Sequence, residues 1–351
     1  MPAMVEEPSK QSAPFDLPRA HGGPWVRGRF RTVPEDFQVD ERLEVPEHAT
    51  GAHWWLRIRK TSLNTKDVVR ALAELSSARV RQIGYAGLKD RHAITTQWFS
   101  LPLENLDPES ITERLPPGME LLEWRRARHA IRRGGLKANR FVIRLREVSG
   151  DIPGLQSARE RLAGGIPNYF GEQRFGRRGE NLGRARRLFD GTLTRVPRFK
   201  RGLYLSATRS WLFNLVLAER VRQGNWDQLL PGEAVMLHGS KSWFSLDGAP
   251  ETLANRLEER DIHPSGPLPG LGEPGTTGAC ADLEQAVLDT ERALVLGLEH
   301  WRLRAERRAL RLLPDALDMR HSDGDLELRF DLPPGTYATS VLREIADLIR
   351  D

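Results

Sequence analysis

Apolar and polar positions alternate in several short stretches of the chain, a pattern typical of half-buried β-strands. It predicts strands at residues 29–42, with a turn at Pro34, and at residues 53–59 and 326–332. Residues 139–146 (NRFVIRLR) alternate with a period of two, so their basic side chains share one face of the predicted strand.

Apolar side chains recur at helical spacing elsewhere. From residue 65 to 78 the apolar positions Val68, Val69, Leu72 and Leu75 fall on one helical face, and Asn64 stands at the expected N-cap. The same spacing predicts further helices at residues 181–189, 206–223, 281–301 and 338–350. The Gly- and Pro-rich residues 264–278 lack the glycine pattern of a nucleotide-binding turn and are predicted to form a loop. Strand patterns at both ends around a helix-rich middle indicate a discontinuous main domain with an insertion.

Asp90 lies in a predicted loop, residues 87–93, followed by a Thr- and aromatic-rich strand that ends at Leu101. Functional side chains concentrate on loops that a rigid scaffold positions. Lys89 and Arg91 flank the carboxylate, and opposite charge nearby favours its ionised form, which suits a nucleophile or a base better than a proton donor. Taken alone, the loop fits a surface ion-pair cluster better than a catalytic site.

Basic residues, which give the chain a net charge of +5, gather in three tracts. Residues 125–146 contain nine Lys or Arg and no acid, residues 174–187 six Arg and one Glu, and residues 195–209 five cations and no acid. Clustered cations without nearby acids are typical of a surface that binds a polyanion, so the tracts indicate nucleic-acid binding. The alternative is a solvated surface with an arginine bias, since only seven residues are Lys.

The remaining composition narrows the class of protein. At 351 residues the chain is long enough for two domains, and its single cysteine, Cys280, excludes an intrachain disulfide and a Cys-based zinc site. Residues 1–24 are punctuated by Pro and Gly without an apolar run, which predicts a flexible tail and not a signal peptide. No stretch approaches the roughly 20 apolar residues that span a bilayer. We therefore expect a cytoplasmic protein with no membrane association.

Five motifs stand in order along the chain: residues 34–37 (PEDF), 84–93 (GYAGLKDRHA), 168–176 (NYFGEQRFG), 209–214 (RSWLFN) and 334–344 (PGTYATSVLRE). Together they resemble the TruD family of transfer-RNA pseudouridine synthases. The resemblance covers the chain from about Phe30 to Glu344, which makes chance agreement remote. The first 24 residues contribute no usable motif to this resemblance.

The resemblance implies roles for particular side chains. Asp90 stands at the catalytic aspartate of the family, and Phe37 stands at a position that lines the uridine site. Asn139 stands at a second substrate-contacting position, and Phe141 stands where other synthase families keep an active-site Tyr. Tyr337 matches a third substrate position, where the family often has Phe. The wall of the uridine site that this residue forms therefore differs only in polarity.

Three cations complete the predicted site. Arg31 falls where a cation commonly pairs with the catalytic acid, and Lys89 and Arg91 support the loop. By residue type alone, aromatic residues such as Phe37, Phe141 and Tyr337 would more often belong to the core. Asn139 could simply cap or turn the chain before its strand.

The implied fold is α+β, a pseudouridine-synthase catalytic domain on a mixed, mainly antiparallel sheet with an inserted α/β TRUD domain. The implied boundaries are a tail at residues 1–24, a discontinuous catalytic domain at 25–164 plus 312–351, and an insert at 165–311. The implied substrate is uridine 13 in the D arm of tRNA, usually including tRNA for glutamate. No metal, cofactor or protein partner is implied.

Pseudouridine formation detaches uracil from ribose, turns the base and rejoins it through carbon, without a redox step or phosphate cleavage. A carboxylate could attack uracil carbon 6 or the anomeric carbon, or act as a base that gives a glycal, and the sequence leaves these routes open. Each requires the target base out of its stack. Two other classes remain as alternatives, a non-catalytic RNA-binding protein on the same fold and a metal-dependent nuclease, which needs a second carboxylate near Asp90.

Overall fold

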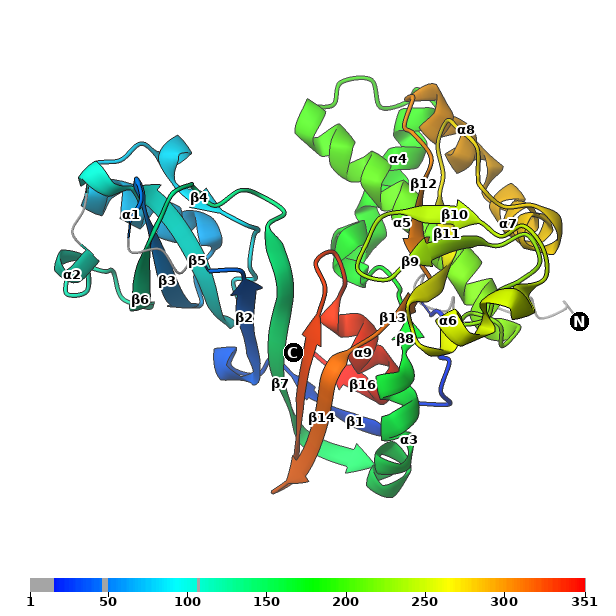
Figure 1. Cartoon of the computed structure of the whole chain (residues 1–351), viewed down its shortest axis with the longest axis horizontal. Coiled ribbons are helices and arrows are strands. Elements are labelled where there is room, and N and C mark those ends of the chain that lie inside the picture. Colours follow the sequence, from blue (N-terminus) through cyan, green and yellow to red (C-terminus); the bar gives the residue numbers. More distant parts are fainter. Residues whose placement is uncertain (1–15, 46–49, 106–107, 351) are drawn as a thin grey trace, which may run out of the picture. The chain divides into compact units, whose positions relative to one another are not determined.

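The computed structural model describes residues 16–45, 50–105 and 108–350 (Figure 1). The chain divides into two compact units. One, which we call the sheet unit, comprises Gly23–Gly164 and Leu313–Asp351. The other, the helix-rich unit, comprises Gly165–Leu312 with the described part of Met1–Gly22. No helix among the described residues combines the length and the apolar character that crossing a membrane requires.

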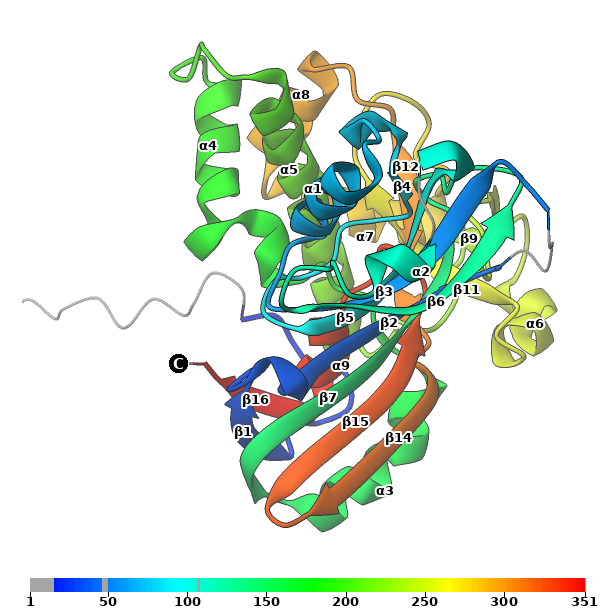
Figure 2. The same cartoon turned by 90° about the vertical axis from the view of Figure 1, so that its left-hand side faces the viewer.

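The sheet unit is built on a ten-stranded sheet, in which β7 crosses between β15 and β2 (Figure 2). The central order is β14-β15-β7-β2-β5-β3-β6, while β1 pairs with β7 and β16, and β4 pairs with β5. Its strands are β1 (Val26–Phe30), β2 (Phe37–Leu43), β3 (His53–Thr61), β4 (Gly84–Tyr85), β5 (Ile94–Pro102), β6 (Met119–Ala127), β7 (Leu136–Gly150), β14 (Asp315–Ser322), β15 (Asp325–Leu332) and β16 (Ala346–Ile349). Only the β2–β5 and β1–β16 pairings are parallel, which confirms the mixed, mainly antiparallel sheet.

Helix α1 (Thr65–Ser76) packs on this sheet as its apolar spacing predicts. Val68 and Leu72 are buried in one cluster with Leu56 of β3 and Phe99 of β5. Asn64 is the N-cap, and its backbone N–H donates to the Asp67 carboxylate at 2.8 Å. The helix is therefore fixed at its first turn, which is the turn that faces the Asp90 loop.

The other helices of the sheet unit are α2 (Pro108–Ile111), α3 (Ile152–Gly164) and α9 (Ala338–Ile345). The helix predicted to extend to residue 350 is wrong beyond Ile345, because Ala346 is extended and begins a strand parallel to β1. Apolar spacing could not reveal this end, since the partner strand lies more than 300 residues earlier in the chain.

The helix-rich unit combines a four-stranded sheet, in the order β10-β9-β11-β12, with a two-stranded pair, β8 and β13. Its strands are β8 (Ile166–Pro167), β9 (Ala234–Leu237), β10 (Trp243–Ser245), β11 (Ile262–Leu268), β12 (Glu306–Ala309) and β13 (Arg311–Leu312). Its helices are α4 (Glu180–Phe189), α5 (Arg198–Arg222), α6 (Ala254–Glu258), α7 (Gly278–Asp289) and α8 (Arg292–His300). Because β8 pairs with β13, the two ends of the unit lie side by side.

Three predictions for this unit needed correction. The helix expected at residues 206–223 begins earlier, at Arg198. The single helix expected at 281–301 is broken between α7 and α8 at Thr290 and Glu291. The loop expected at 264–278 starts as strand β11, in which Pro264 lies opposite Val235 of β9 and Pro267 opposite Arg307 of β12.

The tail predicted for residues 1–24 is shorter than expected. The Tyr169 hydroxyl donates to the Pro18 carbonyl oxygen at 3.2 Å, and a ring nitrogen of His21 lies 2.8 Å from the Gly165 carbonyl oxygen. His21 also meets Trp226 edge-on. Residues 18–21 are therefore packed within the helix-rich unit, while residues 1–15 of the predicted tail lie outside the described residues.

Candidate active site

Asp90 lies in the loop between β4 and β5, on the sheet unit. Its carboxylate is 41% exposed, and an oxygen accepts a hydrogen bond from Arg31 Nη2 at 2.9 Å. The carboxylate therefore reaches solvent while a cation holds it from one side. The role expected for Arg31, pairing with this acid, agrees with its position.

Three buried polar side chains, those of Lys60, Gln97 and Thr65, hold the backbone of this loop. Lys60 Nζ donates to the carbonyl oxygens of Asp90, at 2.7 Å, and of Leu63, at 2.6 Å. Gln97 Nε2 donates to the Gly87 carbonyl oxygen at 2.6 Å. Leaving such buried groups without partners costs about 1–3 kcal/mol each, so the contacts make the loop rigid.

Thr65 joins these supports into one network. Its hydroxyl oxygen accepts the backbone N–H of Lys89 at 2.9 Å and donates to Gln97 Oε1 at 3.1 Å. The first residue of α1, strand β5 and the Asp90 loop are thus connected through one buried hydroxyl. Burial also lowers the pKa of Lys60 to about 8, although the charge of Asp90 opposes the shift.

Sequence reading missed Lys60, Thr65 and Gln97. A signal was present for Lys60, because it occupies an inward position in the alternation of β3, between the exposed Arg59 and the half-buried Thr61. A polar residue at a core position usually has a specific partner. No local signal marks Gln97, since nearly the whole of β5 is buried.

Arg31 is held in a strained conformation. It follows β1 with a φ of 62°, in the left-handed region that residues other than Gly rarely adopt, and such strain gathers at functional sites. Its guanidinium lies 3.8 Å from the ring centroid of Phe37 and 5.1 Å from that of Phe30. These contacts position the guanidinium toward Asp90.

The two cations beside Asp90 in the sequence do not pair with it. Lys89 is buried, its ammonium lies 3.5 Å from Glu41 and it donates a hydrogen bond to Asn139 Oδ1. Burial lowers the pKa of Lys89 and raises the pKa of Glu41, and the attraction between the two groups opposes both shifts. Arg91 is exposed and forms no ion pair within the described chain. The charge partner of Asp90 is thus Arg31, the residue that follows β1.

The predicted aromatic residues differ in exposure. Phe37 and Phe141 are 2% and 8% exposed, with ring centroids 5.9 Å apart, and Phe141 stacks on Phe330 at 5.5 Å. They form a core beneath the site, with little free ring surface. Tyr337 is half-buried at the N-cap of α9, five residues beyond Leu332, which pairs with Asn139.

Five of the nine cations in the tract at residues 125–146 form ion pairs with described acids. The ion pairs are Arg125–Glu123, Lys137–Glu44, Arg140–Asp331, Arg144–Glu327 and Arg146–Asp36. The prediction of unneutralised charge is therefore wrong for these five cations. Arg140 and Arg144 of β7, for example, meet Asp331 and Glu327 across the antiparallel pairing with β15.

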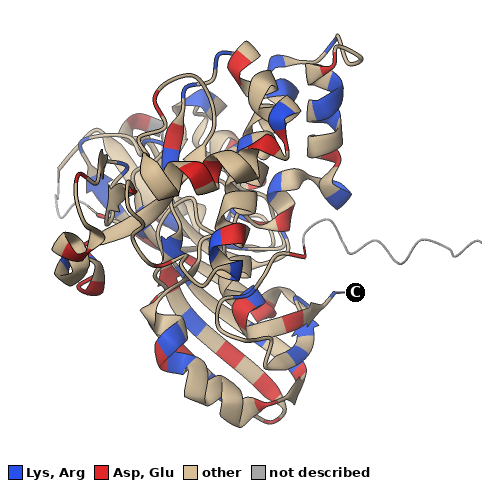
Figure 3. Cartoon of the chain, turned by 90° about the vertical axis from the view of Figure 1, so that its right-hand side faces the viewer, with Lys and Arg blue, Asp and Glu red and all other residues tan. Residues whose placement is uncertain are grey.

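The tract at residues 174–187 runs into α4, where arginines recur along the helix (Figure 3). Arg184 pairs with Glu180 and Arg186 pairs with Glu291. The third tract leads into α5, whose first turn holds no acid. The described residues include no group of three or more His, Cys, Asp or Glu that could hold a metal ion.

Comparison with known proteins places the chain in a family. The family model described as tRNA pseudouridine synthase D (TruD) matches residues 20–184 and 180–345. A protein from Methylococcus capsulatus named tRNA pseudouridine synthase D is 46% identical over 337 residues, which are 95% of this chain and 94% of the relative. A protein of the same name from Xanthomonas campestris pv. campestris (strain B100) is 46% identical over 348 residues, 95% of each chain.

A solved structure assigned to tRNA pseudouridine synthase D (TruD) from Methanosarcina mazei has the same fold. It superimposes with a TM-score of 0.74 at 19% sequence identity and covers 94% of each chain. The resemblance inferred from the five motifs is confirmed over nearly the whole length. This chain therefore belongs to the tRNA pseudouridine synthase D (TruD) family.

Proposed function

We propose that this protein isomerises uridine to pseudouridine in tRNA, at position 13 of the D arm, and that tRNA for glutamate is among its substrates. The names of its relatives support the reaction class. The observation that carries the proposal is Asp90, a solvent-reaching carboxylate paired with Arg31 on a loop that buried side chains hold by its backbone.

Asp90 is the group that acts on the substrate in this proposal. Its free surface allows the carboxylate to reach a reacting atom, while the hydrogen bond from Arg31 holds the carboxylate from one side. Three routes fit this carboxylate: attack on uracil carbon 6, attack on the anomeric carbon, or removal of a ribose proton to give a glycal. Rigid support of the loop keeps the carboxylate in place for any of them.

The target base must leave its stack to reach Asp90, so the proposal includes base flipping. Asn139 and Tyr337 are half-buried and have free surface to contact the base. Phe37 and Phe141 are nearly enclosed, so they act mainly by packing beneath the site, and Phe37 also carries Arg31 on its ring face. We assign Lys89 to positioning Asn139, to which it donates a hydrogen bond.

The isomerisation has no net oxidation and transfers no phosphate, so the proposal needs no cofactor and no metal. We also propose that the helix-rich unit, Gly165–Leu312, is the inserted TRUD domain of the family. Its adjacent ends, joined by the β8–β13 pair, are the geometry expected of an insertion into another domain.

Mass-spectrometric mapping of pseudouridine in tRNA from cells with and without this protein tests the proposal. We expect pseudouridine at position 13 to disappear from a subset of tRNAs, including tRNA for glutamate, and to return when the protein is supplied again. Unchanged tRNA modification together with retained tRNA binding would instead support a non-catalytic RNA-binding protein.

A further inference from the structure

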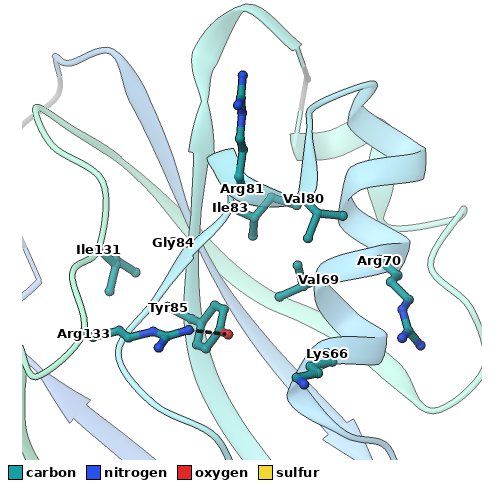
Figure 4. Close-up of a pocket in the computed structure, with 10 residues that line it drawn as sticks. All are labelled: Lys66, Val69, Arg70, Val80, Arg81, Ile83, Gly84, Tyr85, Ile131 and Arg133. Carbon is teal, nitrogen blue, oxygen red and sulfur yellow. Dashed lines mark hydrogen bonds between the residues drawn. The ribbon is translucent and has the colours of Figure 1, made fainter. Parts of the chain in front are cut away.

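A pocket of about 490 Å³ opens on the sheet unit beside β4, apart from the Asp90 carboxylate (Figure 4). Its walls come from α1, from the short 3-10 helix η2 (Val80–Gln82), from β4 and from the segment around Ile131 and Arg133. None of the residues that line it belongs to the site described above.

The pocket gathers positive charge that the fold leaves unpaired. Four of its lining residues are cations and none is an acid. Arg70 lies 3.5 Å from Asp67, whereas Lys66, Arg81 and Arg133 are exposed and form no ion pair with any described residue. This differs from β7, where the arginines lie beside acids of neighbouring strands. Unpaired cations around a hollow attract a phosphate.

Tyr85 adds an aromatic surface to this charge. The Arg133 guanidinium lies 5.7 Å from the Tyr85 ring centroid, and its Nη2 donates to the Tyr85 hydroxyl at 3.5 Å, as Figure 4 shows. The side chains of Val69 and Ile83 supply apolar surface in the same pocket. A half-buried ring with a guanidinium beside it is the combination on which unpaired bases of RNA stack.

The wall that carries Arg133 is fixed against β4. Ile131 N–H donates to Ser100 Oγ at 2.8 Å. A Cβ at Gly84 would lie only 2.5 Å from both the Ile131 carbonyl oxygen and Ser100 Oγ, so this close approach requires glycine. The two sides of the pocket are thus held at a fixed spacing before a ligand binds.

The pocket shares its supports with the Asp90 loop. Strand β4 leads directly into that loop, and Gly134, next to Arg133, donates its N–H to the Ala86 carbonyl oxygen at 3.3 Å. On the other side, Lys66 follows Thr65, whose hydroxyl accepts the Lys89 N–H at 2.9 Å. An RNA strand that presents a base to Asp90 would therefore continue along elements that also form the pocket.

We infer that this pocket binds a nucleotide of the substrate RNA other than the reacting uridine. Its phosphate is attracted by the exposed cations Lys66, Arg81 and Arg133, which stand at different edges of the pocket (Figure 4), and its base lies against Tyr85. The inference rests on the proposed function for the identity of the RNA. A free nucleotide carries the same phosphate and base, so the experiment must distinguish a nucleotide within the RNA from a free nucleotide.

The test compares two triple variants of the full-length protein. Lys66→Ala/Arg81→Ala/Arg133→Ala removes the unpaired cations of the pocket. The matched control, Arg159→Ala/Arg320→Ala/Arg329→Ala, removes three exposed arginines of the same unit that pair with Asp318 or Glu327. Affinity for unmodified tRNA is measured by filter binding over a salt series, and thermal unfolding verifies that each variant is folded.

We expect the pocket variant to bind tRNA at least tenfold more weakly, with a log–log salt slope smaller by about 0.7 to 0.9, because the contact with one phosphate is lost. The control should keep the slope of the wild type. Turnover at saturating tRNA should change little in either variant. Tyr85→Leu should lose about tenfold in affinity and Tyr85→Phe should restore it, because stacking needs the ring and not the hydroxyl.

Equal salt slopes for the pocket variant and the control would overturn the inference. So would unchanged tRNA binding combined with loss of AMP binding by equilibrium dialysis at millimolar AMP, which would identify a free-nucleotide site. Pseudouridine formation by the wild type is measured in parallel. If the wild type forms none but the slopes differ as expected, the proposed function fails while RNA binding by the pocket stands.

Discussion

The ammonium of Lys60 lies 2.7 Å from the backbone carbonyl oxygen of Asp90, and the same ammonium holds Leu63 at 2.6 Å. A buried side chain of β3 thus fixes the loop that carries the exposed carboxylate, without touching the carboxylate itself. Lys60 is a positioning residue in this account, and its removal should affect turnover by moving Asp90.

Replacing Lys60 by Met keeps the length of the side chain but removes its donors. We expect a loss of about 1–3 kcal/mol in the free energy of unfolding, because two buried carbonyl oxygens lose their partner. We also expect kcat to fall by at least tenfold with a smaller change in KM, since Asp90 is no longer held. Arg59→Met, on the exposed face of the same strand, is the matched control. Wild-type kcat in a folded Lys60→Met variant would remove Lys60 from this role.

The lowered pKa of Lys60, about 8 against an ordinary value of 10.5, also predicts a dependence of stability on pH. Between these values the unfolded chain binds more protons at this residue than the folded one, so the free energy of unfolding rises with pH. Denaturant unfolding from pH 7 to pH 10 should therefore show a steeper rise for the wild type than for Lys60→Met. Parallel curves for the two proteins would contradict the burial-lowered pKa.

Arg31→Met should slow the reaction more than it destabilises the fold. The Arg31–Asp90 pair is partly exposed, and such pairs contribute about 1 kcal/mol or less to stability. The carboxylate, however, loses the hydrogen bond that holds it in position, so single-turnover rates should fall at least tenfold. Arg31→Lys should recover part of the rate, because it restores the charge but not the planar contact with Phe37. Equal rates for Arg31→Met and the wild type would rule out this role.

Asn139→Ala should reduce turnover at saturating tRNA without changing the salt slope of binding, because its amide carries no charge to a phosphate. It also leaves Lys89 with Glu41 as its remaining side-chain partner, which keeps the buried charge compensated. Filter binding and single-turnover kinetics measure the two effects separately. A changed slope with a normal rate would reassign Asn139 to backbone binding.

Sequence patterns over short stretches were enough to predict several of the elements that position the site. The apolar face of α1, the N-cap at Asn64 and the loop around Asp90 all follow from residues that are close in sequence. The side chains that hold the loop cannot be predicted in this way. Lys60 meets Asp90 across 30 residues, and Arg140 meets Asp331 across 191 residues, so neither contact has a local signature.

The two cations beside Asp90 show that even neighbours in the sequence need not be in contact in the structure. Consecutive residues of an irregular loop point in different directions, so sequence adjacency did not make Lys89 a partner of Asp90. The fold instead supplied Arg31 from the end of another strand, through a left-handed backbone conformation that no local pattern indicated. The family resemblance identified Arg31 where the composition of the loop could not.

Asp90→Asn tests the central claim most directly, because it removes the carboxylate and keeps the size of the side chain. The assay measures tritium released from carbon 5 of uracil in labelled tRNA, with filter binding in parallel. Asp323→Asn, in the exposed turn between β14 and β15, is the matched control. We predict no release above background for Asp90→Asn, tRNA affinity close to that of the wild type, and full release for the control. Appreciable tritium release by Asp90→Asn would contradict the assignment of Asp90 as the working carboxylate.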